Sequence, residues 1–201
     1  MKKLCAMIFA SIMLLSITMS VEALESKEIS RQDGVYAVAD WSDTNGNVTT
    51  YTYLSVDKTN EGTYVSISMS TYDSVTDSYS DKYGSVYTRD DIFIMDKKLD
   101  SASLSPVEIA ISEWYYDETE DYYTSKDAGT LTVSADWTGI GDLSRGSFKH
   151  TSRDGDYIFR SAENSLSRDA SITASIDGNF FESQYYASMV SFKSARMSMN
   201  K

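Results

Sequence analysis

The fold is decided by Thr130–Asp142, TLTVSADWTGIGD, which joins a strand pattern to a turn. Alternate side chains in its first eight residues are apolar, namely Leu131, Val133, Ala135 and Trp137. The positions between them are polar, and this period of two predicts a half-buried strand. We expect Gly139 and Gly141 to end it. The same Ala-Asp-Trp motif occurs early in the chain, as Ala39-Asp40-Trp41.

The N-terminus has the pattern of a secretory signal peptide. Lys2 and Lys3 precede an apolar run from Leu4 to Met19, and Val21-Glu22-Ala23 supplies small residues for cleavage after Ala23. A retained anchor is the alternative, although the run falls short of the ~20 apolar residues of a spanning helix. Cys5 lies at the start of the run instead of at its end, which argues against a lipoprotein. We expect residues 1–23 to be removed and the mature chain to be secreted, either extracellular or in the cell envelope.

The mature chain has 201 − 23 = 178 residues, enough for a single domain over 24–201 with a core that needs no disulfides. Its net charge is −12 − 1 = −13, because the signal peptide carries +1. Phosphate binding requires a concentrated basic face, which we do not expect this acidic chain to assemble. The composition therefore disfavours nucleic acid and anionic membranes as partners.

Most of the chain past Glu25 reads as short strands separated by turn signals. Asn45-Gly46 predicts a tight hairpin between Gly34–Trp41 and Val48–Val56. Thr63–Tyr72 alternates cleanly between apolar residues and serine. No stretch shows apolar residues at helical spacing for three turns. These patterns predict an all-β fold, an antiparallel β-sandwich or barrel-like domain.

The domain also has a candidate internal repeat. Residues 62–105 align without gaps on 155–198, which suggests two similar halves, 34–105 and 129–201, joined by a strand and acidic loop over 106–128. Only 8 of 44 aligned positions are identical, and five of these are serine. Recurrence of similar strands through composition is the alternative to true duplication.

Between the two halves lies the densest mixture of acidic and aromatic residues, Glu113–Asp127, EWYYDETEDYYTSKD. Its rings could stack on a sugar or another protein, and they form the predicted binding set: Trp114, Tyr115, Tyr116, Tyr122 and Tyr123. Its carboxylates are candidate Ca²⁺ ligands: Asp117, Glu118, Glu120 and Asp121. No spacing matches a defined calcium loop. A solvated hairpin loop is the alternative, and the sequence specifies no cofactor.

Catalytic residues are not predicted. Asp40 and Asp136 each precede a tryptophan, as glycosidase acids can, but an aspartate on the wet face of a strand is ordinary. His150 is the single histidine, and no Ser-His-Asp order or nucleophile elbow surrounds it. We therefore expect a protein that is not an enzyme, with a glycoside hydrolase as the least favoured class.

The function expected is that of a secreted or cell-surface β-protein with an adhesion, envelope-structural or ligand-binding role. Its partner would be a surface protein or a polysaccharide. A carbohydrate-binding module is one alternative. An outer-membrane β-barrel is another, although the chain ends in Lys201 and charges such as Asp90 and Lys97 interrupt its candidate lipid-facing bands.

Overall fold

The computed structural model describes residues 28–117, 121–155, 157–182 and 186–200, and the predicted signal peptide lies outside them. These residues form an all-β fold, as predicted, and contain no helix. The strands are β1 (Glu28–Asn45), β2 (Val48–Thr59), β3 (Thr63–Asp73), β4 (Ser78–Thr88), β5 (Phe93–Met95), β6 (Ser101–Asp117), β7 (Tyr122–Asp154), β8 (Tyr157–Ile176), β9 (Asn179–Glu182) and β10 (Tyr186–Asn200).

The strands form one antiparallel sheet whose hydrogen bonds close into a ring. The order β10-β1-β2-β3-β4-β6-β7-β8 is completed by pairing of β8 with β10. β5 pairs with β6, and β9 with β8. The β4–β6 seam is the shortest on the ring, from Asp81↔Trp114 to Gly84↔Ile111. This closure favours the barrel-like form of the predicted domain.

The core fills the inside of the ring. Every strand of the ring except β4 contributes buried apolar side chains, among them Ala37, Leu54, Ile67, Ile109, Val133, Ile172 and Met189, and β4 adds the partly buried Val86. Trp41 and Trp137 are also buried, and the ring of Trp137 meets Phe93 edge-on at 5.9 Å. The predicted alternation along Thr130–Trp137 is confirmed, because Val133, Ala135 and Trp137 are all buried.

The first predicted hairpin is confirmed, with its turn one residue later than expected. Asn45 pairs with Val48, so Gly46 and Asn47 are the two loop residues. Gly46 has a φ of 62°, whereas Asn47 does not have a positive φ. Glycine alone at the first loop position fits a type II′ turn instead of the type I′ turn that an Asn-Gly pair favours.

The predicted end of the Thr130–Trp137 strand at Gly139 and Gly141 is wrong. β7 instead runs on without a break to Asp154. Gly141 has a φ of 66° and lies in an irregularity of the β7–β8 register between Ile140 and Ser144. The glycine therefore marks a bulge that bends the strand.

The aligned halves have different structures. The β3–β4 turn at residues 74–77 aligns with 167–170, which lie inside the continuous strand β8. A hairpin in the first segment thus corresponds to one long strand in the second. This comparison does not support the predicted duplication.

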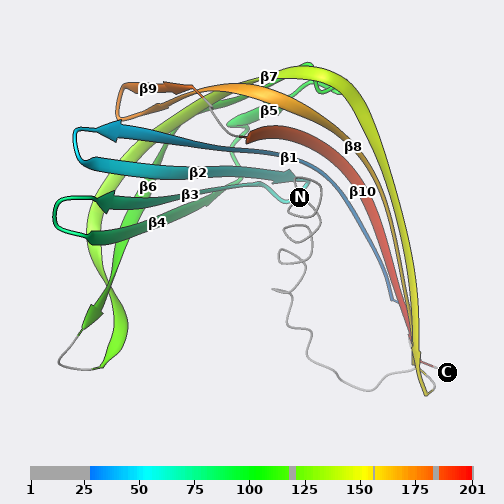
Figure 1. The fold of residues 1–201 in the computed structure, drawn as a ribbon. Coiled ribbons are helices and arrows are strands. Elements are labelled where there is room, and N and C mark those ends of the chain that lie inside the picture. Colours follow the sequence, from blue (N-terminus) through cyan, green and yellow to red (C-terminus); the bar gives the residue numbers. More distant parts are fainter. Residues whose placement is uncertain (1–27, 118–120, 156, 183–185, 201) are drawn as a thin grey trace.

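Four strands extend beyond the ring as a curved sheet that we call the arm. It consists of residues 28–33 of β1, 144–154 of β7, 157–168 of β8 and 191–200 of β10. β1 pairs with β2 only from Gly34 onward, and β6 pairs with β7 only as far as Thr138. The arm therefore lies beyond both of these pairings. Figure 1 shows these strands arching away from the ring.

Candidate functional site

The acidic, aromatic segment forms the β6–β7 hairpin, and its strands reach further than predicted. β6 continues to Asp117 and β7 begins at Tyr122. Trp114 is 49% exposed and Tyr123 is 70% exposed, and Tyr115 and Tyr122 are exposed as well. These four predicted site residues are therefore open to solvent instead of belonging to the core.

The rings of the hairpin divide between its two faces. Trp114 lies opposite Ser125, and Tyr115 lies opposite Thr124. Tyr123 pairs with Tyr116, two residues from Trp114, so Trp114 and Tyr123 share one face. Tyr115 and Tyr122 share the other face. The described rings of the hairpin are therefore split between two faces instead of forming one aligned platform.

The predicted calcium ligands are only partly covered by the structure. Glu118 and Glu120 lie outside the described residues, and Asp117 is described by its backbone alone. Asp121 is exposed with a φ of 56°. In the described part of the chain, no three His, Cys, Asp or Glu side chains gather as metal ligands do.

An ion pair fastens the base of the hairpin. Lys126 Nζ lies 3.1 Å from Glu113 Oε2 and 5.4 Å from the centre of the Tyr115 ring. Ser80 Oγ donates a hydrogen bond of 2.7 Å to Glu113 Oε1. The Ser80 hydroxyl and then Lys126 hold the pKa of Glu113 below its usual value. Glu113 thereby links β4, β6 and β7 at the short seam.

A larger aromatic surface lies on the outside of the ring, and we call it the tyrosine face. Alternation from the buried residues of β1–β4 and β10 places nine of the fifteen tyrosines there: Tyr36, Tyr51, Tyr53, Tyr64, Tyr72, Tyr79, Tyr83, Tyr87 and Tyr186. Trp114 adjoins them through its pairing with Asp81 of β4. Sequence analysis missed this surface, although Tyr79, Tyr83 and Tyr87 already lie at even spacing on one strand.

Hydroxyls and carboxylates separate the rings of the tyrosine face. One row across the strands runs Asp40–Tyr53–Ser68–Tyr83, and the next runs Ser42–Tyr51–Ser70–Asp81–Trp114. Neighbouring groups form hydrogen bonds with one another. Tyr64 Oη and Tyr83 Oη are 2.9 Å apart, and Ser70 Oγ donates a hydrogen bond of 2.5 Å to Asp81 Oδ1. The rings of Tyr72 and Tyr79 are 4.7 Å apart. The surface thus offers both ring faces and polar groups held in fixed positions.

Burial perturbs the ionisable groups at the centre of this face. Asp57 lies between Tyr36 of β1 and Tyr64 of β3, and desolvation raises its pKa to about 6. Desolvation also raises the pKa of Tyr36 and of Tyr53 to about 12. These phenols therefore stay protonated at neutral pH.

The aspartates considered for catalysis are not brought together. Asp40 is on β1 and Asp136 is on β7, and β10 and β8 separate these strands in the sheet. Burial raises the pKa of Asp40. Asp136 is exposed opposite Ser103 and Thr173. His150 is also exposed, stacked on Phe148 at 6.3 Å on the arm.

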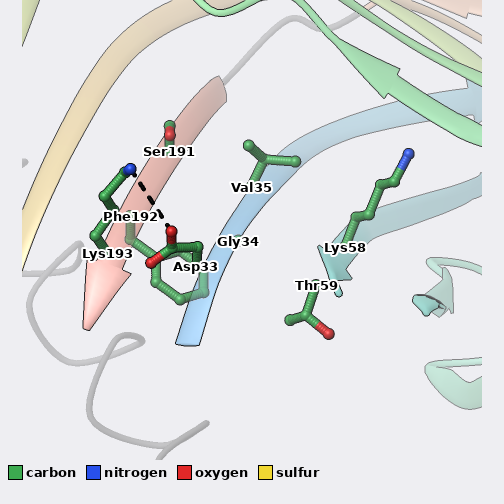
Figure 2. A pocket seen from close by; sticks show the side chains of 8 residues that line it. All are labelled: Asp33, Gly34, Val35, Lys58, Thr59, Ser191, Phe192 and Lys193. Carbon is green, nitrogen blue, oxygen red and sulfur yellow. Dashed lines mark ion pairs between the residues drawn. The ribbon is translucent and has the colours of Figure 1, made fainter. Parts of the chain in front are cut away.

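A shallow pocket of about 280 Å³ lies where β2 ends and the arm begins. Figure 2 shows Asp33 and Lys193 on its wall, paired at 3.6 Å, with Lys58 across from them. Lys58 is itself engaged, since it pairs with Asp91 and donates a hydrogen bond to the Phe93 carbonyl. The pocket is therefore a shallow depression that is open to solvent, and its charged side chains are already in ion pairs.

Comparison with protein-family models, with curated proteins and with solved structures found no match to this chain. Among the described residues, no helix is long and apolar enough to cross a membrane.

Proposed function

We propose that this chain is an exported, non-catalytic binding protein that attaches to a cell-surface or envelope partner through its tyrosine face. The observation that carries the proposal is the grouping of nine tyrosines on one outer surface. Tyrosine is enriched in recognition surfaces because it combines a large apolar ring with a hydroxyl at low conformational cost. The export part rests on the predicted signal peptide at residues 1–23.

The exposure of the rings supports this role. Tyr79 is 74% exposed, and Tyr51, Tyr83, Tyr87 and Tyr186 are exposed to lesser degrees. The polar groups beside them include buried Ser55, which bonds to Ser66 at 2.8 Å. Tyrosine rings that are this exposed do not pack in the core. The hydroxyls and carboxylates also differ from the apolar band that lipid-facing strands need, so they favour a surface that faces water.

A polysaccharide is the second candidate partner, favoured by the way rings alternate with hydroxyls and carboxylates along each row. Sugars are recognised by an aromatic ring against the apolar face of the pyranose and by hydrogen bonds to its hydroxyls. Asp81, with Trp114 and Tyr51 in the same row, offers this combination. The hairpin ring Trp114 would then act together with the tyrosine face.

The test replaces three exposed tyrosines of this face together, Tyr51→Ser, Tyr79→Ser and Tyr87→Ser. Binding of the purified chain to intact cells and to a glycan array is measured. We expect attachment to fall by at least about 100-fold, since rings at a binding centre contribute about 1–3 kcal/mol each. A matched control replaces exposed rings elsewhere, Phe148→Ser, Tyr157→Ser and Phe180→Ser.

The result is decided by the difference between the two variants. Loss of attachment in the tyrosine variant alone, with unchanged thermal unfolding, supports the proposal. Equal binding by both variants rejects it. A signal on the glycan array identifies the carbohydrate form of the function, and attachment to cells without a glycan signal identifies a protein partner.

A further inference from the structure

The two faces of the arm differ in charge. Alternation from buried Ala37 places Ile29, Arg31 and Asp33 of β1 on the side of the sheet that faces the core, here called the inner face. The registers then assign the inner-face cations: Arg31, Arg145, Lys149, Arg153, Arg160, Arg168 and Lys193. Among the described residues of the arm, Asp33 is the single carboxylate on this face. The outer face instead carries Glu28, Asp154 and Glu163 with Arg196.

Most of these cations have no acidic partner. Lys193 pairs with Asp33, and Arg168 pairs with Asp100. In the part of the chain that the structure describes, the remaining five take part in no ion pair: Arg31, Arg145, Lys149, Arg153 and Arg160. All five are exposed. A chain with a net charge of −12 therefore does assemble a basic face, contrary to our expectation from its composition.

Three of the cations converge at one point. Arg160 lies directly opposite Thr151, and Lys149 and Arg153 flank Thr151 on the same face of β7. Diagonal neighbours on adjacent strands have Cβ atoms about 7–8 Å apart, within reach of long side chains. Lys149, Arg153 and Arg160 can therefore contact the same phosphate-sized anion. We call these three residues the cation triad.

An aliphatic floor adjoins the triad. The row that begins at Lys149 continues through Ala162 and Ala195 to Arg31, so small side chains lie between cations at the two edges. The row beside it places Met197 next to Arg160, followed by Ile29, which is 55% exposed. Figure 1 shows the arm curving toward this side, so the floor lies on the concave face of the arm.

The side chains of the floor indicate the class of ligand. Every aromatic residue of the described arm lies on its outer face: Phe148, Tyr157, Phe159 and Phe192. Nucleic-acid bases and sugars are usually held by stacking on such rings, which the inner face does not present. Methionine, alanine and isoleucine instead suit a flexible hydrocarbon chain. The inner face therefore combines groups for a phosphate with a surface for an acyl chain.

We propose that the inner face of the arm binds a membrane lipid with an anionic, phosphate-bearing head group. The head group lies at the cation triad, and an acyl chain lies along the Ala162–Ala195 floor toward Met197. This site is on a different face from the tyrosine face, so either can exist without the other. It also gives an exported acidic protein a means of staying at the envelope surface.

The experiment measures binding of the exported chain to vesicles of phosphatidylcholine with and without phosphatidylglycerol. We expect binding only to the vesicles with phosphatidylglycerol, and weaker binding as salt increases. The variant K149Q/R153Q/R160Q should bind about 100-fold more weakly, at about fivefold for each cation near an anionic surface. The control R89Q/K97Q/K98Q makes the same change in net charge at exposed cations outside the arm and should bind like the parent.

Further measurements separate the alternatives. The floor variant Met197→Gln should weaken binding while leaving its salt dependence unchanged. If the triple variant unfolds, the single variant Lys149→Gln should still show a loss of about fivefold. Equal weakening in the control variant, or no dependence on phosphatidylglycerol, overturns the proposal. The proposal is also overturned if the protein binds a short DNA duplex as tightly as it binds the vesicles. It is overturned as well if the protein binds no vesicles and instead self-associates in a salt-sensitive way that the triad variant abolishes.

Discussion

Trp137 on β7 donates its indole N–H to the backbone carbonyl of Val38 on β1, over 3.1 Å and through the inside of the ring. These strands are not neighbours, because β8 and β10 lie between them. The bond therefore fixes the separation of two walls of the core, while the Trp137 ring packs against Phe93. The tryptophan of the fold-deciding stretch thus has both a packing and a polar role.

Trp137→Phe should destabilise the protein by about 2–4 kcal/mol. The change loses the bond to Val38 and leaves a cavity that the core cannot fill completely. Urea unfolding followed by circular dichroism measures the cost. Tyr51→Phe on the exposed tyrosine face is the control and should cost well under about 1 kcal/mol. Equal costs for the two variants would show that the bond across the core is unimportant.

Gly34→Ala should also be destabilising, because Gly34 lies under the ring of Phe192 on β10. A Cβ atom at position 34 would be 2.7 Å from Phe192 Cζ and 2.9 Å from the carbonyl oxygen of Lys58. We expect a cost of about 1–3 kcal/mol from this overpacking. Adding Phe192→Leu should recover part of it, since the ring can be removed but the backbone carbonyl cannot. A double-mutant cycle by thermal unfolding measures the recovery.

The all-β fold class was predictable because it depends on the local alternation of apolar and polar residues. Val133, Ala135 and Trp137 alternate with polar residues, and Gly46 permits a tight turn, so the strand and the hairpin both follow from neighbouring residues. Strand ends were harder to predict. A glycine such as Gly141 can end a strand or bulge within it, and the choice depends on whether β8 continues alongside.

The surfaces could not be predicted, because they depend on register between distant segments. Arg31, Lys149 and Arg160 are scattered in sequence and share one face only through the pairings of β1, β10, β8 and β7. The hairpin rings were found because Trp114 and Tyr115 are consecutive in a conspicuous run. Because they are consecutive, they lie on opposite faces of a strand. A dense run of aromatic residues in the sequence therefore did not correspond to a single site.

Export should remove the first 23 residues and leave Leu24 as the new N-terminus. Lys2 and Lys3 before an apolar run, with Val21 and Ala23 at the small-residue positions, match what signal peptidase recognises. Edman sequencing or intact-mass measurement of the protein from the producing cells tests this. A chain that still begins at Met1 and sediments with membranes would contradict both the cleavage and the released state.

Trp114 should be the tryptophan that reports on solvent. It is 49% exposed, whereas Trp41 is 2% and Trp137 is 1% exposed. Acrylamide should therefore quench one component of the native fluorescence, and Trp114→Phe should abolish that component with a stability change within about 0.5 kcal/mol. Trp41→Phe serves as the comparison, because it should leave the quenched component intact. Persistence of strong quenching in the Trp114→Phe protein would place the hairpin ring inside the fold.

Asp57→Asn should stabilise the protein at pH 8 but not at pH 3.5. Burial raises the pKa of Asp57 from 3.8 to about 6, so the folded state binds its proton more tightly than the unfolded state does. The stability due to this proton is complete below pH 3.8 and is lost as the pH rises through 6. At pH 8 the ionised, desolvated carboxylate should cost on the order of 3 kcal/mol, which asparagine avoids.

The comparison is made by urea unfolding of both proteins at intervals from pH 3.5 to 8. The neighbouring phenols do not titrate in this range, because the pKa of Tyr36 and of Tyr53 is about 12. Asp43→Asn, at an exposed position of β1, is the control for the substitution itself. If the advantage of Asp57→Asn is the same at every pH, its cause is not the charge. Asp57 would then be well solvated between Tyr36 and Tyr64, and the centre of the tyrosine face would be more open than its burial indicates.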